Sequence, residues 1–373
     1  MMNFASPKKV VFTGGHHNSA LVLARAMRQK GWQVYWFGHK HTMAGEKSVS
    51  LEFKEITKAG FPFIELKTGK FYKNLGPLNL LKIGYGFFQA LVQLIKIKPR
   101  LIFSFGGYLS VPVVLAGLLL RKDCFLQEQT ARAGLANRFL GPLVKKIFLV
   151  WPSSKEFFPA RKTEVVGLPL DPLFWKKTEP SSLFREDLPT ILITGGKQGC
   201  QVINQAVEAR LPELLKKVNL IHQSGGILKT GDYQRLEAER RGLKGDLRRR
   251  YLLKKSFYGQ EMINMLKAAD LVVGRSGAHM IYELLALAKP ALLIPLPWAY
   301  QQEQLANARI LEKAGSALIL PQAKLSGAEL SQKINFMLSH LEGFKKKARL
   351  AKKLVSKKAT EEILKNLEKA LQE

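Results

Sequence analysis

Short runs of aliphatic and β-branched residues alternate with longer amphipathic runs along almost the whole chain, and this alternation strongly constrains the fold. The runs are typified by KVVFTG at 9–14, QVYWFG at 33–38, LIFSF at 101–105, TILITG at 190–195 and LVVG at 271–274. Short strands that alternate with helices are typical of βαβ units, in which helices cover both faces of a parallel sheet. We therefore predict an α/β fold made of doubly wound parallel sheets.

The strand-like runs form two series, separated by a stretch rich in proline and polar residues. At 373 residues the chain is longer than one hydrophobic core usually supports. We predict an N-terminal domain over 1–167, a linker over 168–187, a C-terminal domain over 188–350, and a C-terminal helix over 351–373 that packs back on the N-terminal domain. Ligands of open α/β sheets bind outside the carboxyl ends of the strands. We expect the site in strand-to-helix loops of both domains, which face each other across a cleft.

The formal net charge of +30 predicts a preference for anionic partners. Charge alone leaves nucleic acid, anionic lipid and phosphate-bearing substrates open. Part of the charge lies in the expected helical stretch 344–358, where it also suits a solvated helix face. The sequence contains no zinc-finger, RNP or helix-turn-helix signature, so we expect no nucleic-acid partner.

The cysteine pattern and the N-terminus predict an intracellular protein. Cys124 and Cys200 form no CxxC pair, which argues against a disulfide framework or a zinc site and fits a reducing compartment. No long apolar segment follows residues 1–9, so we expect no secretory signal. The uncharged stretch 101–120 contains a Gly-Gly pair and a proline, and we predict a strand, a turn and a helix rather than a membrane span.

Three loops in the first half carry candidate functional groups. The loop 13–16, TGGH, follows a strand and precedes a helix, so its amides could approach an anionic ligand, although it lacks the GxGxxG spacing of dinucleotide-binding loops. His16 has an unperturbed pKa near 6.5 and is a candidate general base, with a helix cap as the alternative. The loops 106–108 and 128–137 offer groups that could bind a sugar, or that could serve only as turn and capping residues.

The second half contains a comparable set. Lys197 lies among glycines in the loop 195–199, GGKQG, which predicts an anion-binding loop that is not a P-loop. Glu283 lies on the helix after GRSGA and could accept hydrogen bonds from a ribose diol, or could be a surface carboxylate. Gln304 and Asn307 are three residues apart, share a helix face and could hold sugar hydroxyls.

Taken together and in order, six strings resemble those of the MurG family of bacterial glycosyltransferases: TGGH, SFGGYLSVPVVLA, QEQTARAGLANR, GGKQG, ADLVVGRSGAHMIYE and PLPWAYQQEQLANA. The resemblance covers nearly the whole chain and is far more specific than any single string. It implies a GT-B fold of two Rossmann-like domains, an inverting mechanism, and no metal or cofactor. It also implies transfer of N-acetylglucosamine from UDP-N-acetylglucosamine to the 4-hydroxyl of lipid I, the undecaprenyl-diphosphate-linked N-acetylmuramoyl peptide, giving lipid II for peptidoglycan synthesis.

The resemblance also implies roles for individual residues. His16 would be the catalytic base, Glu283 would bind the ribose, and Gln304 with Asn307 would bind the N-acetylglucosamine. The full set implied for UDP-N-acetylglucosamine is Thr13, Gly14, Gly15, Thr130, Lys197, Gln198, Gly199, Arg275, Ser276, Gly277, Ala278, Glu283, Gln304 and Asn307. Those implied for the acceptor side are Tyr108, Glu128 and Gln129.

Four positions depart from the family's usual residues. Ser19 replaces a proline, Thr130 an asparagine and Lys197 a serine. Asp171 stands where the family has an arginine at the donor site. We hypothesise that Lys197 compensates for that lost positive charge. The exact donor and acceptor therefore stay open, and the alternatives include a diacylglycerol glycosyltransferase and a UDP-N-acetylglucosamine epimerase of similar fold.

The segment 71–100 predicts contact with a membrane surface. Apolar and aromatic residues alternate there with Lys73 and Lys82, a pattern that suits an anionic bilayer. This is also where the family docks to its lipid, so we expect a peripheral protein on the cytoplasmic face of the plasma membrane. Within the segment, we expect the helix over 88–95 to be mostly buried.

Overall fold

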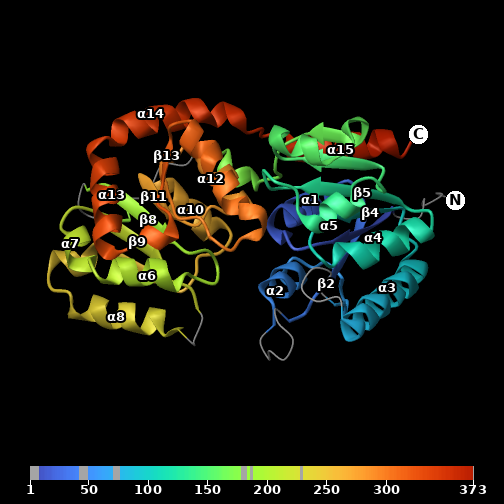
Figure 1. Ribbon diagram of the computed structural model, residues 1–373, viewed down its shortest axis with the longest axis horizontal. Coiled ribbons are helices and arrows are strands. Elements are labelled where there is room, and N and C mark those ends of the chain that lie inside the picture. The colour runs from blue at the N-terminus through green and yellow to red at the C-terminus, as the bar shows by residue number, and fades with distance from the viewer. Residues whose placement is uncertain are drawn as a thin grey trace. The chain divides into compact units, whose positions relative to one another are not determined.

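The structure, a computed structural model, describes residues 8–41, 49–69, 76–177, 183–184, 188–226 and 230–372. The chain forms two compact units (Figure 1): Met1–Asp171 with Ser356–Glu373, and Pro172–Val355. Much of the predicted linker, at 178–182 and 185–187, lies outside the described residues, as does Lys73. Leu168 and Leu170, at the start of that linker, are buried.

The first unit is built on a seven-stranded parallel sheet in the order β3-β2-β1-β4-β5-β6-β7. Its strands are β1 (Lys9–Thr13), β2 (Gln33–Gly38), β3 (Phe63–Glu65), β4 (Leu101–Ser104), β5 (Asp123–Glu128), β6 (Lys146–Leu149) and β7 (Thr163–Val165). From β1 the chain first adds strands on one side, through β2 and β3, and then on the other, from β4 onward. The crevice between the loops after β1 and β4 is therefore the topological switch point at which such sheets bind ligands.

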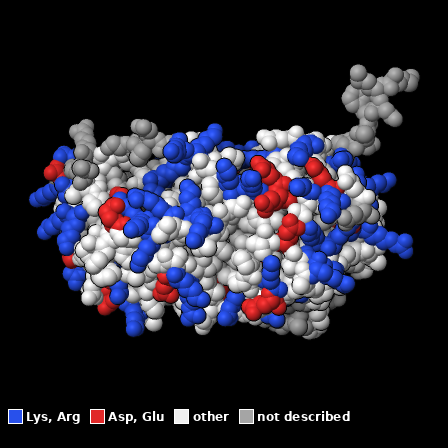
Figure 2. All heavy atoms as spheres, turned by 90° about the horizontal axis from the view of Figure 1, so that it is seen from above, with Lys and Arg blue, Asp and Glu red and all other residues white. Residues whose placement is uncertain are grey.

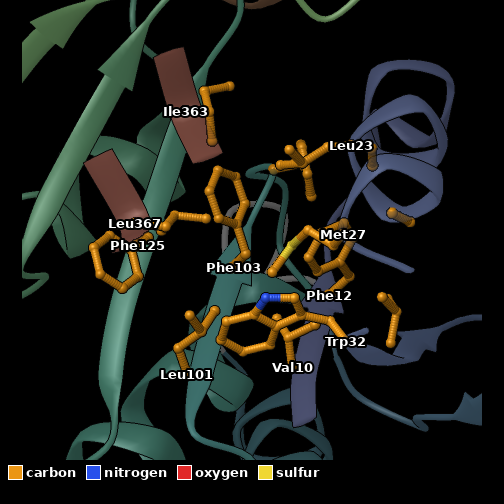
Figure 3. Close-up of a cluster of buried hydrophobic side chains, with 14 of the residues drawn as sticks. Val10, Phe12, Leu23, Met27, Trp32, Leu101, Phe103, Phe125, Ile363 and Leu367 are labelled. Carbon is orange, nitrogen blue, oxygen red and sulfur yellow. The ribbon is translucent and has the colours of Figure 1, made fainter. Parts of the chain in front are cut away.

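Helices cover both faces of this sheet: α1 (His17–Gln29), α2 (Leu51–Lys58), α3 (Pro77–Ile97), α4 (Ser110–Leu119), α5 (Leu135–Leu140) and α15 (Ala359–Ala370). Successive strand residues point to opposite faces. Val10 and Phe12 therefore pack with α1 and α15, as Figure 3 shows, whereas Val11 packs with α3 and α4. The last helix of the chain thus contributes Ile363 and Leu367 to a core that begins with the first strand.

The second unit has a six-stranded parallel sheet in the order β10-β9-β8-β11-β12-β13. Its strands are β8 (Thr190–Thr194), β9 (Asn219–Gln223), β10 (Tyr251–Lys254), β11 (Leu271–Gly274), β12 (Ala291–Leu293) and β13 (Ala317–Ile319). Its helices are α6 (Gln201–Glu208), α7 (Leu211–Leu215), α8 (Asp232–Gly242), α9 (Asp246–Arg249), α10 (Gln260–Ala268), α11 (Ala278–Leu287), α12 (Glu303–Lys313), α13 (Gly327–Ser339) and α14 (Leu341–Ala351). The switch point lies between β8 and β11, and the loops after these strands are GGKQG and GRSGA.

Helix α3 contradicts one prediction. We expected the helix over 88–95 to be mostly buried, but Phe88, Val92 and Ile95 are exposed. Helix α3 packs on α4 through a face that includes Ala90 and Leu94, and its Gln89 side chain bonds to Glu65 and Lys67. The face with the exposed residues remains uncovered. Among the described residues, α3 is also the one helix whose length and hydropathy would suffice to cross a membrane. The uncharged stretch after it folds as predicted, into β4 and α4.

On the face shown in Figure 2, lysine and arginine side chains greatly outnumber aspartate and glutamate. The expected helical stretch 344–358 is interrupted, because α14 ends at Ala351 and a short 3-10 turn follows to Leu354. Within the described residues, the exposed cations of α14 and this turn form no ion pair with a carboxylate: Lys346, Lys347, Arg349, Lys352 and Lys353.

Candidate functional site

The loops after β1 and β4 meet backbone to backbone at the switch point of the first unit. Gly14 has a φ of +123°, and a Cβ placed on it would lie 2.5 Å from the Gly106 carbonyl oxygen. The amide of Gly15 donates a hydrogen bond to that same oxygen over 3.3 Å. Only glycine fits at position 14, because a side chain would force the two loops apart.

His16 lies at the position that caps α1, yet its side chain makes no capping hydrogen bond. Its Nδ1 lies instead 3.2 Å from the carbonyl oxygen of Phe105. A carbonyl only accepts hydrogen bonds, so Nδ1 carries the proton and Nε2 carries the lone pair. Burial lowers the pKa of His16, and the negative charge of Glu128 partly opposes that shift. The ring is therefore a neutral imidazole at cellular pH, as a general base requires.

The neighbouring His17 has a different partner. Its Nε2 lies 3.0 Å from a carboxylate oxygen of Glu55, on α2. The two histidines at the start of α1 are thus distinguished by their partners, one a carbonyl and the other a carboxylate. The His16 ring contacts the loop that follows β4, and the His17 ring contacts α2.

Glu128, at the end of β5, is buried and holds its own loop together. Its carboxylate accepts hydrogen bonds from the Thr130 amide at 2.9 Å and hydroxyl at 2.7 Å. It also accepts bonds from the Gly134 amide at 3.0 Å and the Asn137 side-chain amide at 2.8 Å. These four bonds direct both carboxylate oxygens toward the loop. Tyr108, also expected on the acceptor side, is half-buried beside His39.

Besides Thr130, two further departures from the family pattern have partners in the first unit. Ser19 accepts a hydrogen bond from the side-chain amide of Gln129 over 2.6 Å, which ties the loop after β5 to the first turn of α1. Gln129 is buried, so this amide faces the protein interior. A proline at position 19 could not make this contact. Asp171 lies 4.0 Å from Arg25 in a partly exposed ion pair.

In the second unit, the backbone of the loop 195–199 packs closely against the loop after β9. Gly199 has a φ of +87°, and a Cβ there would lie 2.1 Å from the Ser224 carbonyl oxygen. Gln198 is exposed, and its backbone amide donates no hydrogen bond within the described part of the chain. Helix α6 begins three residues later, at Gln201, without a side-chain cap at its N-terminus. This loop therefore has backbone donors that suit the binding of an anion.

Glu283, on α11, is half-buried and electrostatically coupled to Lys197. Burial raises the pKa of Glu283 to about 7, although the positive charge of Lys197 acts to lower it. The Lys197 cation of the glycine-rich loop and the Glu283 carboxylate of α11 thus interact electrostatically. When ionised, a carboxylate accepts hydrogen bonds at both oxygens, as binding of a diol requires.

The remaining predicted donor-site residues are hydrogen-bonded to one another or to neighbouring loops. The Arg275 guanidinium donates to the Ile294 carbonyl at 2.9 Å and to the Gln322 side chain at 2.6 Å. The Ser276 hydroxyl donates to the Gln304 carbonyl at 2.8 Å. Asn307 is fully buried, and its amide donates to the Ser276 carbonyl at 3.4 Å. Gly277 is the N-cap residue of α11, and Ala278 is the first residue of that helix.

Arg275, Ser276 and Asn307 fix the loops after β11 and β12. Gln304 is half-buried, and its side-chain oxygen also accepts a hydrogen bond from a loop, over 3.1 Å from the Leu296 amide. Among the described residues, no group of three or more His, Cys, Asp and Glu side chains is placed to hold a metal ion.

The sequence did not single out Gln223, whose side chain contacts the glycine-rich loop. Its only signal was a polar residue at the carboxyl end of a strand.

Known families match both units. Residues 10–149 match the Glycosyltransferase family 28 N-terminal domain, and residues 190–366 match the Glycosyltransferase family 28 C-terminal domain. Two similar curated proteins are both called UDP-N-acetylglucosamine--N-acetylmuramyl-(pentapeptide) pyrophosphoryl-undecaprenol N-acetylglucosamine transferase. The protein of Clostridium botulinum (strain Langeland) is 31% identical over 88% of this chain and 91% of its own length. That of Halothermothrix orenii is 33% identical over 93% and 94%. The chain belongs to the MurG family, within glycosyltransferase family 28.

Solved structures agree with this membership in the MurG family. The crystal structure of Acinetobacter baumannii MurG is 25% identical, covers 97% of this chain and 100% of its own, and has a TM-score of 0.70. CalG4, the calicheamicin glycosyltransferase, is 12% identical over 99% of both chains, with a TM-score of 0.68. The second likeness shows the fold alone. The predicted GT-B fold of two Rossmann-like domains is confirmed, and the protein is a glycosyltransferase.

Proposed function

We propose that this protein transfers N-acetylglucosamine from UDP-N-acetylglucosamine to the 4-hydroxyl of lipid I, with inversion at the anomeric carbon. The relatives' names support both substrates. The observation that carries the proposal is the position of His16: the Phe105 carbonyl fixes its tautomer, next to the glycine turn of a family 28 domain. The epimerase alternative has no comparable support, since epimerases such as that of Neisseria meningitidis match at 13% identity and share the fold alone.

The reaction is a single displacement. The acceptor hydroxyl attacks C1 of the sugar, Nε2 of His16 takes the hydroxyl proton, and the bond from C1 to the UDP oxygen breaks. Negative charge then develops on the diphosphate. In the second unit that charge is met by the amides of the glycine-rich loop, the N-terminus of α6 and Lys197, which are positioned before the reaction begins.

The donor roles follow the local geometry. Glu283 accepts the ribose hydroxyls, and Gln304 contacts the sugar. Thr13, Gly14, Gly15 and Thr130 belong to the loops at the carboxyl edge of the first sheet. Arg275 and Asn307 act on the donor through the loops that they hold, because their polar groups bond to protein carbonyls.

Turnover with two acceptors tests this function. Purified protein is supplied with UDP-N-acetylglucosamine and either a lipid I analogue or diacylglycerol, and UDP release and the new glycoside are measured. We expect a β-linked product with the lipid I analogue alone. Product only with diacylglycerol would move the protein to another lipid acceptor, and C2 epimerisation of the donor without transfer would replace the function altogether.

We propose that α3 holds the enzyme on the cytoplasmic face of the plasma membrane. Six of its residues, spaced alternately three and four apart, form one apolar stripe and are 47–75% exposed: Leu78, Leu81, Tyr85, Phe88, Val92 and Ile95. Exposed Lys82 and Lys96 lie on the same helix. The opposite face of α3 packs against α4, so inserting the whole helix across a bilayer would remove part of the domain core. An interfacial position buries the α3 stripe and keeps that core.

A further inference from the structure

A buried glutamine fixes the glycine-rich loop of the second unit. Gln223 ends β9, and its side-chain amide donates to the Thr194 hydroxyl and to the Gly196 carbonyl, each over 2.9 Å. Its side-chain oxygen accepts a hydrogen bond from the Phe257 amide over 2.7 Å. One side chain therefore joins the loops that follow β8, β9 and β10. All of its hydrogen-bonding atoms are engaged in doing so.

The next carbonyl along the loop is held from the same side of the sheet. The hydroxyl of Ser256, in the loop after β10, donates to the Lys197 carbonyl over 3.2 Å. Two consecutive peptide units, 196–197 and 197–198, thus have their carbonyls bound by residues at the ends of β9 and β10. In a planar trans peptide the N–H points opposite to the C=O. The N–H groups of Lys197 and Gln198 must therefore point away from those two loops.

The surroundings of these N–H groups suit an anion. The Gln198 amide donates no hydrogen bond within the described chain, and the first turn of α6 follows directly. Successive N–H groups that converge near a helix N-terminus form an anion-binding concavity. The Gly196 carbonyl also accepts a hydrogen bond from the Gly199 amide over 3.0 Å, so residues 196–199 form a tight turn. Gln223 and Ser256 attach this turn to the ends of β9 and β10 and so set its direction.

We propose that Gln223 and Ser256 are positioning residues that orient two loop amides toward the diphosphate of the nucleotide donor. This inference rests on the proposed function, since it presumes that the second unit binds UDP. Neither side chain touches the ligand in this arrangement. Their effect is on the diphosphate, and the uridine part of the ligand is bound independently of them.

The test compares UDP with uridine, which lacks the diphosphate, by NMR titration of the full chain. The variants are Gln223→Met and Ser256→Ala. Matched controls are Asn219→Leu, a buried amide at the other end of β9 that donates to the Leu188 carbonyl, and Ser331→Ala, a buried hydroxyl on α13. Gln223→Met and Asn219→Leu each remove a buried side-chain amide, and Ser256→Ala and Ser331→Ala each remove a hydroxyl. Thermal unfolding of all four variants measures their effect on stability.

We expect Gln223→Met to raise the Kd for UDP about tenfold or more, and Ser256→Ala several-fold, with the Kd for uridine nearly unchanged in both. The controls should change the UDP-to-uridine affinity ratio little, even where they lower the Tm. Equal losses for UDP and uridine, or an unchanged Kd for UDP, would overturn the positioning role while leaving the proposed function intact. Absence of UDP binding by the wild type would overturn both.

Discussion

At the residue scale, the role of His16 depends on one backbone carbonyl. The Phe105 oxygen fixes which ring nitrogen holds the proton, and burial keeps the ring neutral. The sequence singles out His16 by its place after two glycines but leaves a helix cap as the alternative. The structure argues against the cap, because no capping bond forms and the ring turns toward a loop 89 positions away in the sequence; the general base stays a proposal.

Replacing His16 by alanine should lower kcat by about 10²-fold or more, the usual effect of losing a general base. The Kd for UDP-N-acetylglucosamine should change little, since the ring accepts a proton from the other substrate. Steady-state kinetics with a lipid I analogue and calorimetry with the donor give both values. His17→Ala is the matched control and should keep most of the activity. An unchanged kcat in His16→Ala would make His16 a structural residue.

The raised pKa of Glu283 leads us to expect that the affinity for the donor depends on pH. Its pKa is raised to about 7, and the ionised carboxylate accepts hydrogen bonds at both oxygens, whereas the protonated form has lost part of that acceptor capacity. Binding of UDP should therefore strengthen as pH rises through 7 and weaken as pH falls below it. Calorimetric titrations of UDP from pH 6 to 8.5 should show that the affinity of the wild type, relative to Glu283→Gln, rises with pH. A constant ratio over that range would remove Glu283 from the ribose site.

At the element scale, the loops at both switch points could be predicted from the sequence, because glycine-rich turns after β-branched runs mark the carboxyl ends of parallel strands. Which residues of α3 are buried could not be predicted from the sequence. Its apolar residues occur all around the helix, so periodicity alone does not say which face the domain covers. That was decided by α4, which packs against the face containing Ala90 and Leu94.

Removing two side chains from the α3 stripe should weaken membrane binding. Leu81→Ser/Phe88→Ser removes two exposed apolar groups without changing the charge, and should lower association with anionic vesicles at least about tenfold. Vesicle sedimentation measures this directly. The double variant Leu350→Ser/Leu354→Ser, which removes exposed leucines from α14 and the following turn in the second unit, is the control. Similar losses in the two double variants would show that α3 is not the docking element.

At the scale of the whole molecule, the last segment of the chain, 356–373, belongs to the same unit as the first 171 residues. The second unit ends at Val355, and α15 then packs on α1 and the first sheet (Figure 3). The first unit therefore has a core that is complete only after the second unit has been synthesised. A truncation before residue 356 would expose the face of the sheet formed by Phe103 and Phe125.

The substitution Leu367→Ala should destabilise the first unit by about 2–4 kcal/mol, because the side chain is fully buried against strands far away in the sequence. Hydrogen exchange should show faster exchange in β1, β4 and β5, with β8 and β11 unchanged. Glu368→Ala, which removes an exposed partner of Lys30, is the control and should have little effect. Equal acceleration in both sheets would mean that the two units unfold together.

The sequence by itself determined the fold class, the family and the loops that carry the site, since these depend on local periodicity, on glycines at strand ends and on motifs in a set order. Only the tertiary structure decided which polar side chains bond within the protein rather than face solvent. The carboxylate of Glu128 and the amides of Gln129 and Asn307 could each bind a substrate, yet all three are buried and bonded to neighbouring residues of the protein. Burial and partners depend on strands and helices distant in the sequence, and local patterns do not contain that information.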